Sequence, residues 1–311
     1  MLKHSVLAPV CLFVYARPIH TRRVLRALAR SELAEKAEVI IYSDGPRDER
    51  FEGPVREVRN MLRNIKGFRH IELVTRDRNL GLSASIIGGV TEVCQTHGRV
   101  IVLEDDVVVS RYFLRYMNDS LLRYADDRRI SSIGGYMYPI ANRLPDQFFL
   151  SMTDCWGWAT WQRAWNEFNQ DGSVLLKEIE SKGLVKRFNL DGAYDYRRML
   201  QAQIAGKNDS WAVRWYANEF LKNRLTLFPG RSMTINIGND GSGRHKGNNR
   251  LYGVLTANER LVLRDIPVEE CALARRAINE YLIERQRSVF WRFKEWIIGS
   301  LRRRLYETGI A

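Results

Sequence analysis

Three consecutive acidic residues directly follow a run of four apolar residues. Residues 100–103 are Val, Ile, Val and Leu, and Glu104, Asp105 and Asp106 come next. Such an apolar run is typical of a strand buried on both faces of a parallel sheet. Unpaired carboxylates are costly to bury, so we expect the strand to end at these acids. Because ligands bind at the carboxyl ends of strands in α/β sheets, the acids suit a divalent cation and a phosphate. A solvated acidic turn is the alternative.

Strands and helices alternate in the chain before these acids. The pattern predicts strands at residues 6–15, 38–42, 70–75 and 100–103, and helices at residues 20–29, 55–65, 85–94 and 111–124. Thr21 is the expected N-cap of the first helix. This order predicts a parallel sheet with right-handed crossovers, so the expected fold class is α/β, with a mostly parallel sheet flanked by helices.

Polar and small residues follow the other predicted strands. Ala16 and Arg17 come after the first strand, and Arg17 could meet a base or a phosphate. Asp44 follows the second strand in a Ser-Asp-Gly-Pro turn, where it either binds a base or ribose or only caps the turn. The segment from Asn79 to Ser83 enters a helix, and its small residues would allow a ligand to approach the backbone closely.

Glycine and aromatic residues become frequent after residue 131. The segment 154–161 reads Asp-Cys-Trp-Gly-Trp-Ala-Thr-Trp, and further tryptophans follow. Asp154 and Trp158 are the candidate ligand-binding residues of this segment. The other tryptophans are expected in the core, where most tryptophan side chains lie. Residues 236–249 are rich in Gly and Asn, which predicts a loop.

The order of these motifs resembles that of the GT-A glycosyltransferases, and more narrowly the bacterial relatives of the N-acetylglucosaminyltransferase I type. The resemblance covers about residues 6–245, and it rests on residues 9–15 with Arg17, 42–44, 79–82, 103–106, 156–161, 210–215 and 236–243. The acidic triplet followed by the Trp-Gly-Trp run is its most specific part. It implies a GT-A-like domain at residues 1–250, with a nucleotide-binding half (1–130) and an acceptor half (131–250).

This resemblance implies a sugar transferase. The donor would be a nucleotide diphosphate-sugar, UDP-linked, carrying a hexosyl or N-acetylhexosaminyl group, and the acceptor a carbohydrate or a lipid-linked glycan. Asp106 would coordinate Mn²⁺ or Mg²⁺, which offsets the charge of the departing diphosphate. The donor would also contact nine other residues: Ala16, Arg17, Asp44, Asn79, Gly81, Leu82, Ser83, Glu104 and Asp105. Asp154 would contact the acceptor or the transferred sugar, and Trp158 would line the site. Inversion at the anomeric carbon is expected.

The chain departs from the family at the catalytic base. The family's aspartate lies in a Trp-Asp segment, and the matching position here is Ala212. Asp209, immediately before this motif, is the preferred base, and Asp195 is the second candidate. His245 is a candidate second metal ligand. A catalytically impaired membrane partner that binds sugar nucleotides and a metal-dependent phosphotransferase therefore remain alternatives.

The net charge of +13 suggests an anionic partner. Residues 285–304 hold seven arginine or lysine residues against one glutamate, and apolar residues recur there at helical spacing. We therefore expect residues 251–311 to form a C-terminal helical extension in which an amphipathic helix, residues 285–305, binds an anionic membrane surface. The alternative is a helix that packs on the domain and leaves its basic side solvated. No transmembrane span or signal peptide is predicted, and four scattered cysteines fit a reducing compartment, so we expect a cytoplasmic protein at the inner face of the membrane. Nucleic-acid-binding motifs and a P-loop are absent from the sequence, so no nucleic-acid partner is expected.

Overall fold

The computed structural model describes residues 7–140, 144–238, 240, 256–257 and 259–287. The strands are β1 (Val10–Val14), β2 (Glu38–Ser43), β3 (His70–Thr75), β4 (Arg99–Glu104), β5 (Val107–Val109), β6 (Ile130–Gly134), β7 (Gln147–Leu150), β8 (Trp158–Trp161), β9 (Leu225–Pro229) and β10 (Thr234–Asn236). The α-helices are α1 (Pro18–Ala29), α2 (Glu49–Leu62), α3 (Leu82–His97), α4 (Phe113–Arg123), α5 (Gln162–Trp165), α6 (Gly172–Ser181), α7 (Val185–Phe188), α8 (Tyr196–Ile204) and α9 (Trp211–Leu221), followed by a helix at residues 272–287.

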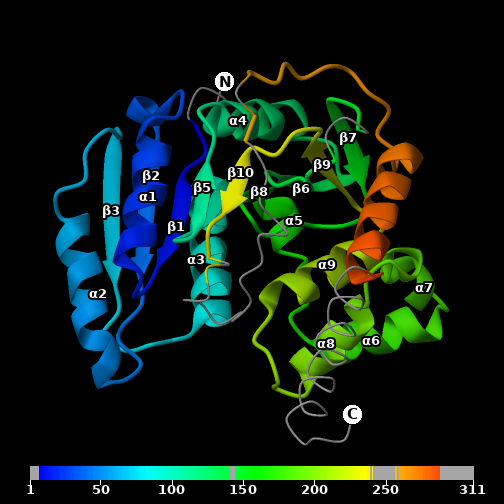
Figure 1. The fold of residues 1–311 in the computed structure, drawn as a ribbon, viewed down its shortest axis with the longest axis horizontal. Helices are drawn as coiled ribbons and strands as arrows, with labels where there is room; N and C mark the ends of the chain where they lie inside the picture. The colour runs from blue at the N-terminus through cyan, green and yellow to red at the C-terminus, as the bar shows by residue number, and fades with distance from the viewer. Residues whose placement is uncertain (1–6, 141–143, 239, 241–255, 258, 288–311) are drawn as a thin grey trace, which may run out of the picture.

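Eight strands form one sheet in the order β3-β2-β1-β4-β8-β6-β9-β7, which Figure 1 shows from one side of the molecule to the other. Strands β1 to β4 are parallel, β8 is antiparallel to both β4 and β6, and β7 is antiparallel to β9. Strands β5 and β10 form a separate antiparallel pair. The prediction of an α/β fold with a mostly parallel sheet flanked by helices is confirmed.

Helices cover both faces of the sheet. Successive residues of β1 point to opposite faces, so this strand contributes to a core on each side. Val10 and Leu12 join a core that includes residues of α1, α2 and α4. Cys11 and Phe13 join a second core that includes residues of α3, α5 and α9. This double burial explains the continuous apolar runs from which the strands were predicted. It also leaves the strand ends as the places for polar chemistry.

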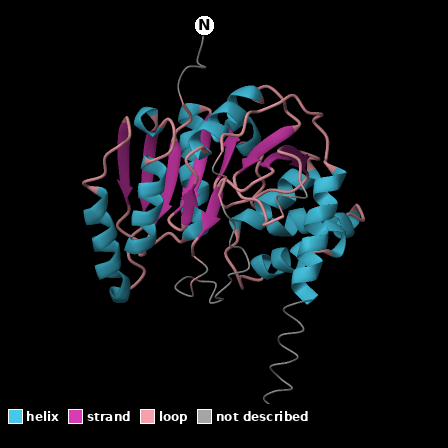
Figure 2. Ribbon diagram, turned by 45° about the horizontal axis from the view of Figure 1, so that its top comes forward, coloured by secondary structure: helices cyan, strands magenta, loops and turns pink. Residues whose placement is uncertain are grey.

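The helix at residues 272–287 belongs to a third core, which it forms with residues of the segment 131–250. Ala274, Ala277 and Ile278 pack with buried residues of β7 and of α6 to α9. The chain reaches this helix through a bridge between Phe149 and Glu270, where the Cys271 N–H donates to the Phe149 carbonyl. Figures 1 and 2 show this helix beside the small helices of that segment. The described part of the extension is therefore packed on residues 131–250.

Helices α1, α2 and α3 each begin earlier than predicted, at Pro18, Glu49 and Leu82. Helix α1 begins at Pro18, whose fixed φ suits a first helical position, and Thr21 lies inside the helix with its hydroxyl donating to the Arg17 carbonyl. Helix α2 begins at Glu49 although Pro54 lacks a donor, because the Asp48 carboxylate accepts from the Arg50 N–H and caps the first turn.

None of the helices in the described ranges is long and apolar enough to cross a membrane. The predicted membrane segment, residues 285–305, lies outside the described residues after position 287. His245 also lies outside them, as does most of the predicted loop at residues 236–249.

Candidate functional site

The acidic triplet lies where β4 ends, beside the end of its neighbour β1. Arg17, the N-cap residue of α1, reaches the acids from that side. Its Nη1 lies 2.7 Å from Oδ2 of Asp106 and 3.9 Å from Oδ1 of Asp105. The Tyr15 N–H donates to Oδ2 of Asp105 at 3.2 Å. The parallel arrangement of β1 and β4 thus brings together two motifs that lie almost ninety positions apart.

A fourth carboxylate joins these acids from the segment before β8. Asp154 lies in the loop between β7 and β8, and β8 pairs directly with β4. Its charge helps to raise the pKa of Glu104, and its Oδ2 accepts the Trp156 N–H at 3.1 Å. Asp154, which was predicted from its place before the Trp-Gly-Trp run, therefore faces the triplet across a pair of adjacent strands.

Positive charge is scarce in this cluster. Burial is the main cause of the raised pKa of Glu104, and repulsion from Asp106, Asp105 and Asp154 adds to it, while Arg17 opposes it. Burial, followed by the charge of Asp106, raises the pKa of Asp105 to about 7. Burial likewise raises the pKa of Asp154 to about 7, although backbone hydrogen bonds oppose it. The cluster therefore favours the arrival of a cation.

Residues after β10 close over the triplet, which sequence reasoning did not foresee. The Ile237 N–H donates to the Asp106 carbonyl, and the Gly238 carbonyl lies 3.4 Å from Nη2 of Arg17. A Cβ at Gly238 would collide with the Asp106 carboxylate, so a larger residue there would have to displace that side chain. Asp240 lies 3.8 Å from Arg17 and 3.1 Å from Nε2 of His20. The Gly-Asn-rich motif hinted at Asp240, whereas no sequence signal pointed to His20.

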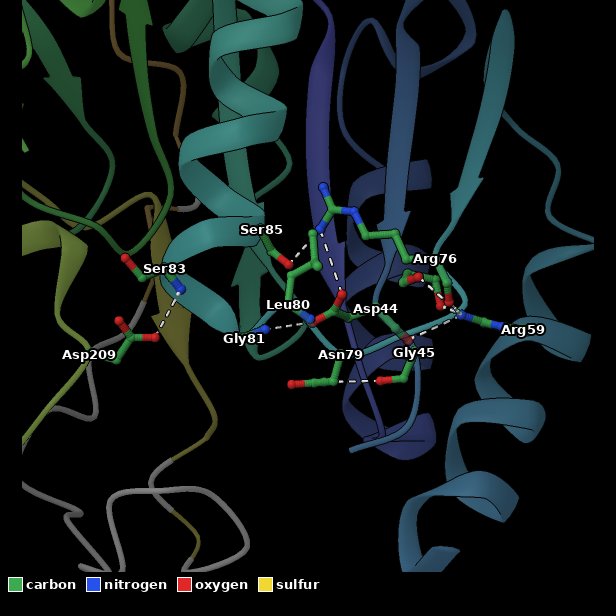
Figure 3. Close-up of polar contacts among 11 residues, drawn as sticks. Asp44, Gly45, Arg59, Arg76, Asn79, Leu80, Gly81, Ser83, Ser85 and Asp209 are labelled. Carbon is green, nitrogen blue, oxygen red and sulfur yellow. Dashed lines mark hydrogen bonds and ion pairs between the residues drawn. The ribbon is translucent and has the colours of Figure 1, made fainter. Parts of the chain in front are cut away.

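Asp44 organises the loop that precedes α3 (Figure 3). Its Oδ2 accepts the N–H groups of Leu80 and Gly81 at 2.9 and 3.0 Å. Its Oδ1 is buried without a hydrogen bond and lies 3.7 Å from Nη1 of Arg76. Asp44 is only 7% exposed. One carboxylate oxygen of Asp44 therefore holds the loop, and the other lies against Arg76.

Further hydrogen bonds fix the same loop. The Asn79 side chain donates to the Gly45 carbonyl, and Arg59 donates to the carbonyls of Ser43, Asp44 and Arg76. Gly81 has a φ of +81°, which requires glycine or a strained residue. The side chain of Leu82, the first residue of α3, is largely exposed.

The amino end of α3 contacts the amino end of α9. Ser83 is buried, and its N–H donates to Oδ2 of Asp209 at 3.4 Å, as Figure 3 shows. Its hydroxyl accepts from Nη2 of Arg214 at 2.6 Å. Asp209 is exposed, and a Cβ at Gly81 would lie 3.6 Å from its carboxylate. The structure therefore brings one candidate base to the predicted donor loop.

Two other predicted residues have contacts away from this loop. Asp195 is the N-cap of α8, where its carboxylate accepts from the Arg198 N–H and the Asn189 side chain. Trp158 is 0% exposed and stacks on Trp211 at a ring distance of 5.1 Å, within a group of tryptophans that also includes Trp165 and Trp215. The expectation that Trp158 lines the site is wrong for this structure, because strand β8 points its side chain into the core. Ala16 lies between β1 and Arg17, at the site's edge.

The residues around Asp106 suit a metal that also has ligands from a substrate. Among the described residues, no three His, Cys, Asp or Glu side chains form a group that could hold an ion. Asp106 keeps some exposure, and the surrounding carboxylates outnumber the guanidinium of Arg17. Mg²⁺ is commonly held by one or two carboxylates together with substrate phosphates, and this donor set fits that arrangement.

No protein-family model matches this chain, and no curated protein matches it. Among solved structures, the mannosyltransferase PcManGT from Pyrobaculum calidifontis, in complex with GDP-Man and Mn²⁺, is 11% identical, with 70% of this chain and 71% of that chain covered and a TM-score of 0.38. S. aureus TarS is 12% identical, with 52% of this chain and 30% of that chain covered and a TM-score of 0.34. Glucosyl-3-phosphoglycerate synthase from Mycobacterium tuberculosis, in complex with Mn²⁺, UDP and glucosyl-3-phosphoglycerate, is 11% identical. The match covers 57% of this chain and 67% of that chain, with a TM-score of 0.33. These scores are too low to assign a family.

Proposed function

We propose that the protein is a metal-dependent glycosyltransferase. It transfers a hexosyl or N-acetylhexosaminyl group from a nucleotide diphosphate-sugar, UDP-linked, to a carbohydrate or lipid-linked glycan. One observation carries the proposal: Glu104, Asp105, Asp106 and Asp154 gather at the carboxyl edge of the parallel strands, where Arg17 is the cation that the described contacts place against the triplet. A bound divalent cation and its diphosphate would relieve the repulsion among these acids.

The chain's own residues divide the work of holding the donor. Asp106 would hold Mn²⁺ or Mg²⁺, which supplies Lewis-acid stabilisation of the leaving diphosphate. Arg17, now 2.7 Å from Asp106, is placed to donate to a phosphate oxygen. Oδ1 of Asp44, which makes no hydrogen bond, would accept from the base or ribose. The loop from Asn79 to Ser83 would present its backbone to the ligand.

The acceptor hydroxyl needs a base, because it is a poor nucleophile while it keeps its proton. Asp209 is our first choice, since it is exposed and contacts the amino end of α3 beside the donor loop. Asp195 is the second choice, although its carboxylate is engaged in capping α8. A base opposite the leaving group would give inversion. Substitution of Asp209 by Asn should lower kcat by about 10² to 10⁴ while leaving nucleotide affinity nearly unchanged.

Membrane association is proposed for residues 285–305 on the basis of their charge and apolar spacing. The protein would then act at the cytoplasmic face, where a lipid-linked acceptor would meet it. Full-length protein and a variant lacking residues 285–311 would be sedimented with anionic and neutral liposomes. Equal sedimentation of both proteins with anionic liposomes would exclude this role for the segment.

The function itself is tested by nucleotide binding. We expect Mn²⁺ and UDP together to raise the melting temperature more than either does alone, and UDP-sugars to be hydrolysed slowly or transferred to an acceptor. GDP and a short DNA duplex serve as controls for the base and for general polyanion binding. Absence of any metal-dependent stabilisation by UDP or UDP-sugars would contradict the proposal. Binding without turnover would instead favour the catalytically impaired partner.

A further inference from the structure

Four aromatic side chains form a continuous row beside the acidic cluster. The ring centroid of Trp156 lies 4.6 Å from that of Tyr136, at an interplanar angle of 73°. Tyr136 lies 5.5 Å from Tyr138, and Tyr138 lies 5.4 Å from Tyr281. Tyr281 belongs to the helix at residues 272–287, so the row joins that helix to the loop before β8.

One end of the row is fixed to the proposed reaction centre. The Trp156 N–H donates to the carboxylate of Asp154, and the Trp156 carbonyl accepts from the Thr234 hydroxyl at 2.7 Å. Gly157 follows with a φ of +82°, and a Cβ there would collide with Thr234. The backbone around Trp156 is therefore held between the acidic cluster and β10.

The row differs from the buried tryptophans of the segment 131–250. Trp158, Trp211 and Trp215 are each at most 2% exposed, as expected of core residues. Trp156, Tyr138 and Tyr281 are partly exposed, while Tyr136 between them is buried and supports its neighbours edge-on. Partly exposed rings gain free energy when an apolar surface covers them. Arg285 lies over the Tyr281 ring, 5.2 Å from its centroid, and donates to the Tyr281 hydroxyl, so a guanidinium adds polar contacts at this end of the row.

We propose that Trp156, Tyr138 and Tyr281, together with Asp154, form a subsite for an oligosaccharide acceptor. A pyranose ring has an apolar C–H face for an aromatic ring and a rim of hydroxyls for Asp154 and the tyrosines. The row leads from the acids to helix 272–287, so the sugar to be extended would lie at Trp156 and the preceding sugars along the tyrosines. This inference rests on the proposed function. It also assigns the role expected of Trp158 to the tryptophan two positions earlier.

Binding of oligosaccharides to the full-length protein tests the subsite directly. The probes are chitotetraose, cellotetraose and mannotetraose at millimolar concentration, measured by saturation-transfer NMR and by titration. The variants are Tyr138→Ala, Tyr281→Ala and Trp156→Phe, the last of which keeps a ring should the alanine variants fold poorly. Phe68→Ala is the matched control, because Phe68 is a partly buried aromatic residue just before β3, at the opposite edge of the sheet. UDP binding with Mn²⁺ is measured for every protein.

At least one oligosaccharide should bind the wild type, and each alanine variant should bind it about threefold to tenfold more weakly. Trp156→Phe should show a smaller loss, and Phe68→Ala should match the wild type. UDP affinity should stay within twofold in all of them. Failure of every oligosaccharide to bind, or binding that survives all three substitutions, overturns the subsite while leaving UDP binding intact. Failure of UDP to bind the wild type instead overturns the proposed function.

Discussion

Asp44 and the acids that follow β4 lie at the same edge of the sheet, and their surroundings differ. One carboxylate oxygen of Asp44 accepts two backbone N–H groups, and Arg76 lies near the other, so Asp44 holds its loop in place. The acids after β4 repel one another, and Arg17 alone lowers the pKa of both Glu104 and Asp105 as an opposing charge. A single aspartate at a strand end can thus hold a loop in place, whereas several neighbouring carboxylates that repel one another favour the binding of a cation.

Substitution of Asp106 is expected to have the largest effect on nucleotide binding and transfer. Asp106→Ala should abolish the Mn²⁺-dependent gain in UDP affinity and lower transfer by about 10² to 10³, because charge stabilisation of the leaving group is lost. Isothermal titration with and without Mn²⁺ measures this. Asp126→Ala, an exposed acid in the segment before β6 at the other edge of the sheet, should behave as the wild type. An unchanged response to Mn²⁺ in Asp106→Ala would remove the metal assignment.

Asp44→Ala should act mainly on the fold of its loop. The N–H groups of Leu80 and Gly81 would lose their acceptor, at a cost of roughly 1 to 3 kcal/mol in the free energy of unfolding. Urea denaturation measures this cost. Asp44→Asn keeps one oxygen and should lose less stability, yet its UDP affinity should still fall. If both variants were as stable as the wild type, the loop would not depend on Asp44.

Asp154→Asn should change how stability depends on pH. Burial raises the pKa of Asp154 from 3.8 to about 7, so the folded protein holds a proton that the unfolded chain releases. The associated stability is present below about pH 4 and is lost as the pH rises through about 7. Asn has no charge to bury and can still accept the Trp156 N–H. The variant should therefore exceed the wild type in stability by about 1 to 2 kcal/mol near pH 8, and by less near pH 5. Equal differences at both values would contradict this account, which thermal denaturation at the two pH values decides.

The smallest effect is expected between α3 and α9. Ser83→Ala would remove the hydroxyl that accepts from Arg214, which keeps its bonds to the carbonyls of Ser210 and Gln170. A loss of about 1 kcal/mol is expected in the free energy of unfolding, measured by urea denaturation. Ser181→Ala, at the exposed end of α6, is the control and should change little. A loss as large as that of Asp44→Ala would mean that this contact contributes as much stability as Asp44 does, and would contradict the expected order.

Regular elements could be predicted well because their signals are local. β3 was predicted with its observed bounds, since its ends are set by polar neighbours. The start of α1 was misplaced because Thr21 was expected to cap it, whereas the φ of Pro18 suits the first turn of a helix. Trp158 was misassigned for a different reason: all four residues of β8 are buried, so its side chain packs in the core on whichever face of the sheet it lies.

The sequence by itself determined that acids end a buried strand, because an apolar run and adjacent carboxylates cannot share one environment. It also placed Arg17 and Asp44 after neighbouring strands. Only the tertiary structure decided what these residues meet. The pairing of β8 with β4 brings Asp154 to the triplet, β10 lays Gly238 and Asp240 over it, and the packing of helix 272–287 adds Tyr281 to the aromatic row. These contacts join distant parts of the chain, and strand order and helix packing, which local patterns do not encode, create them.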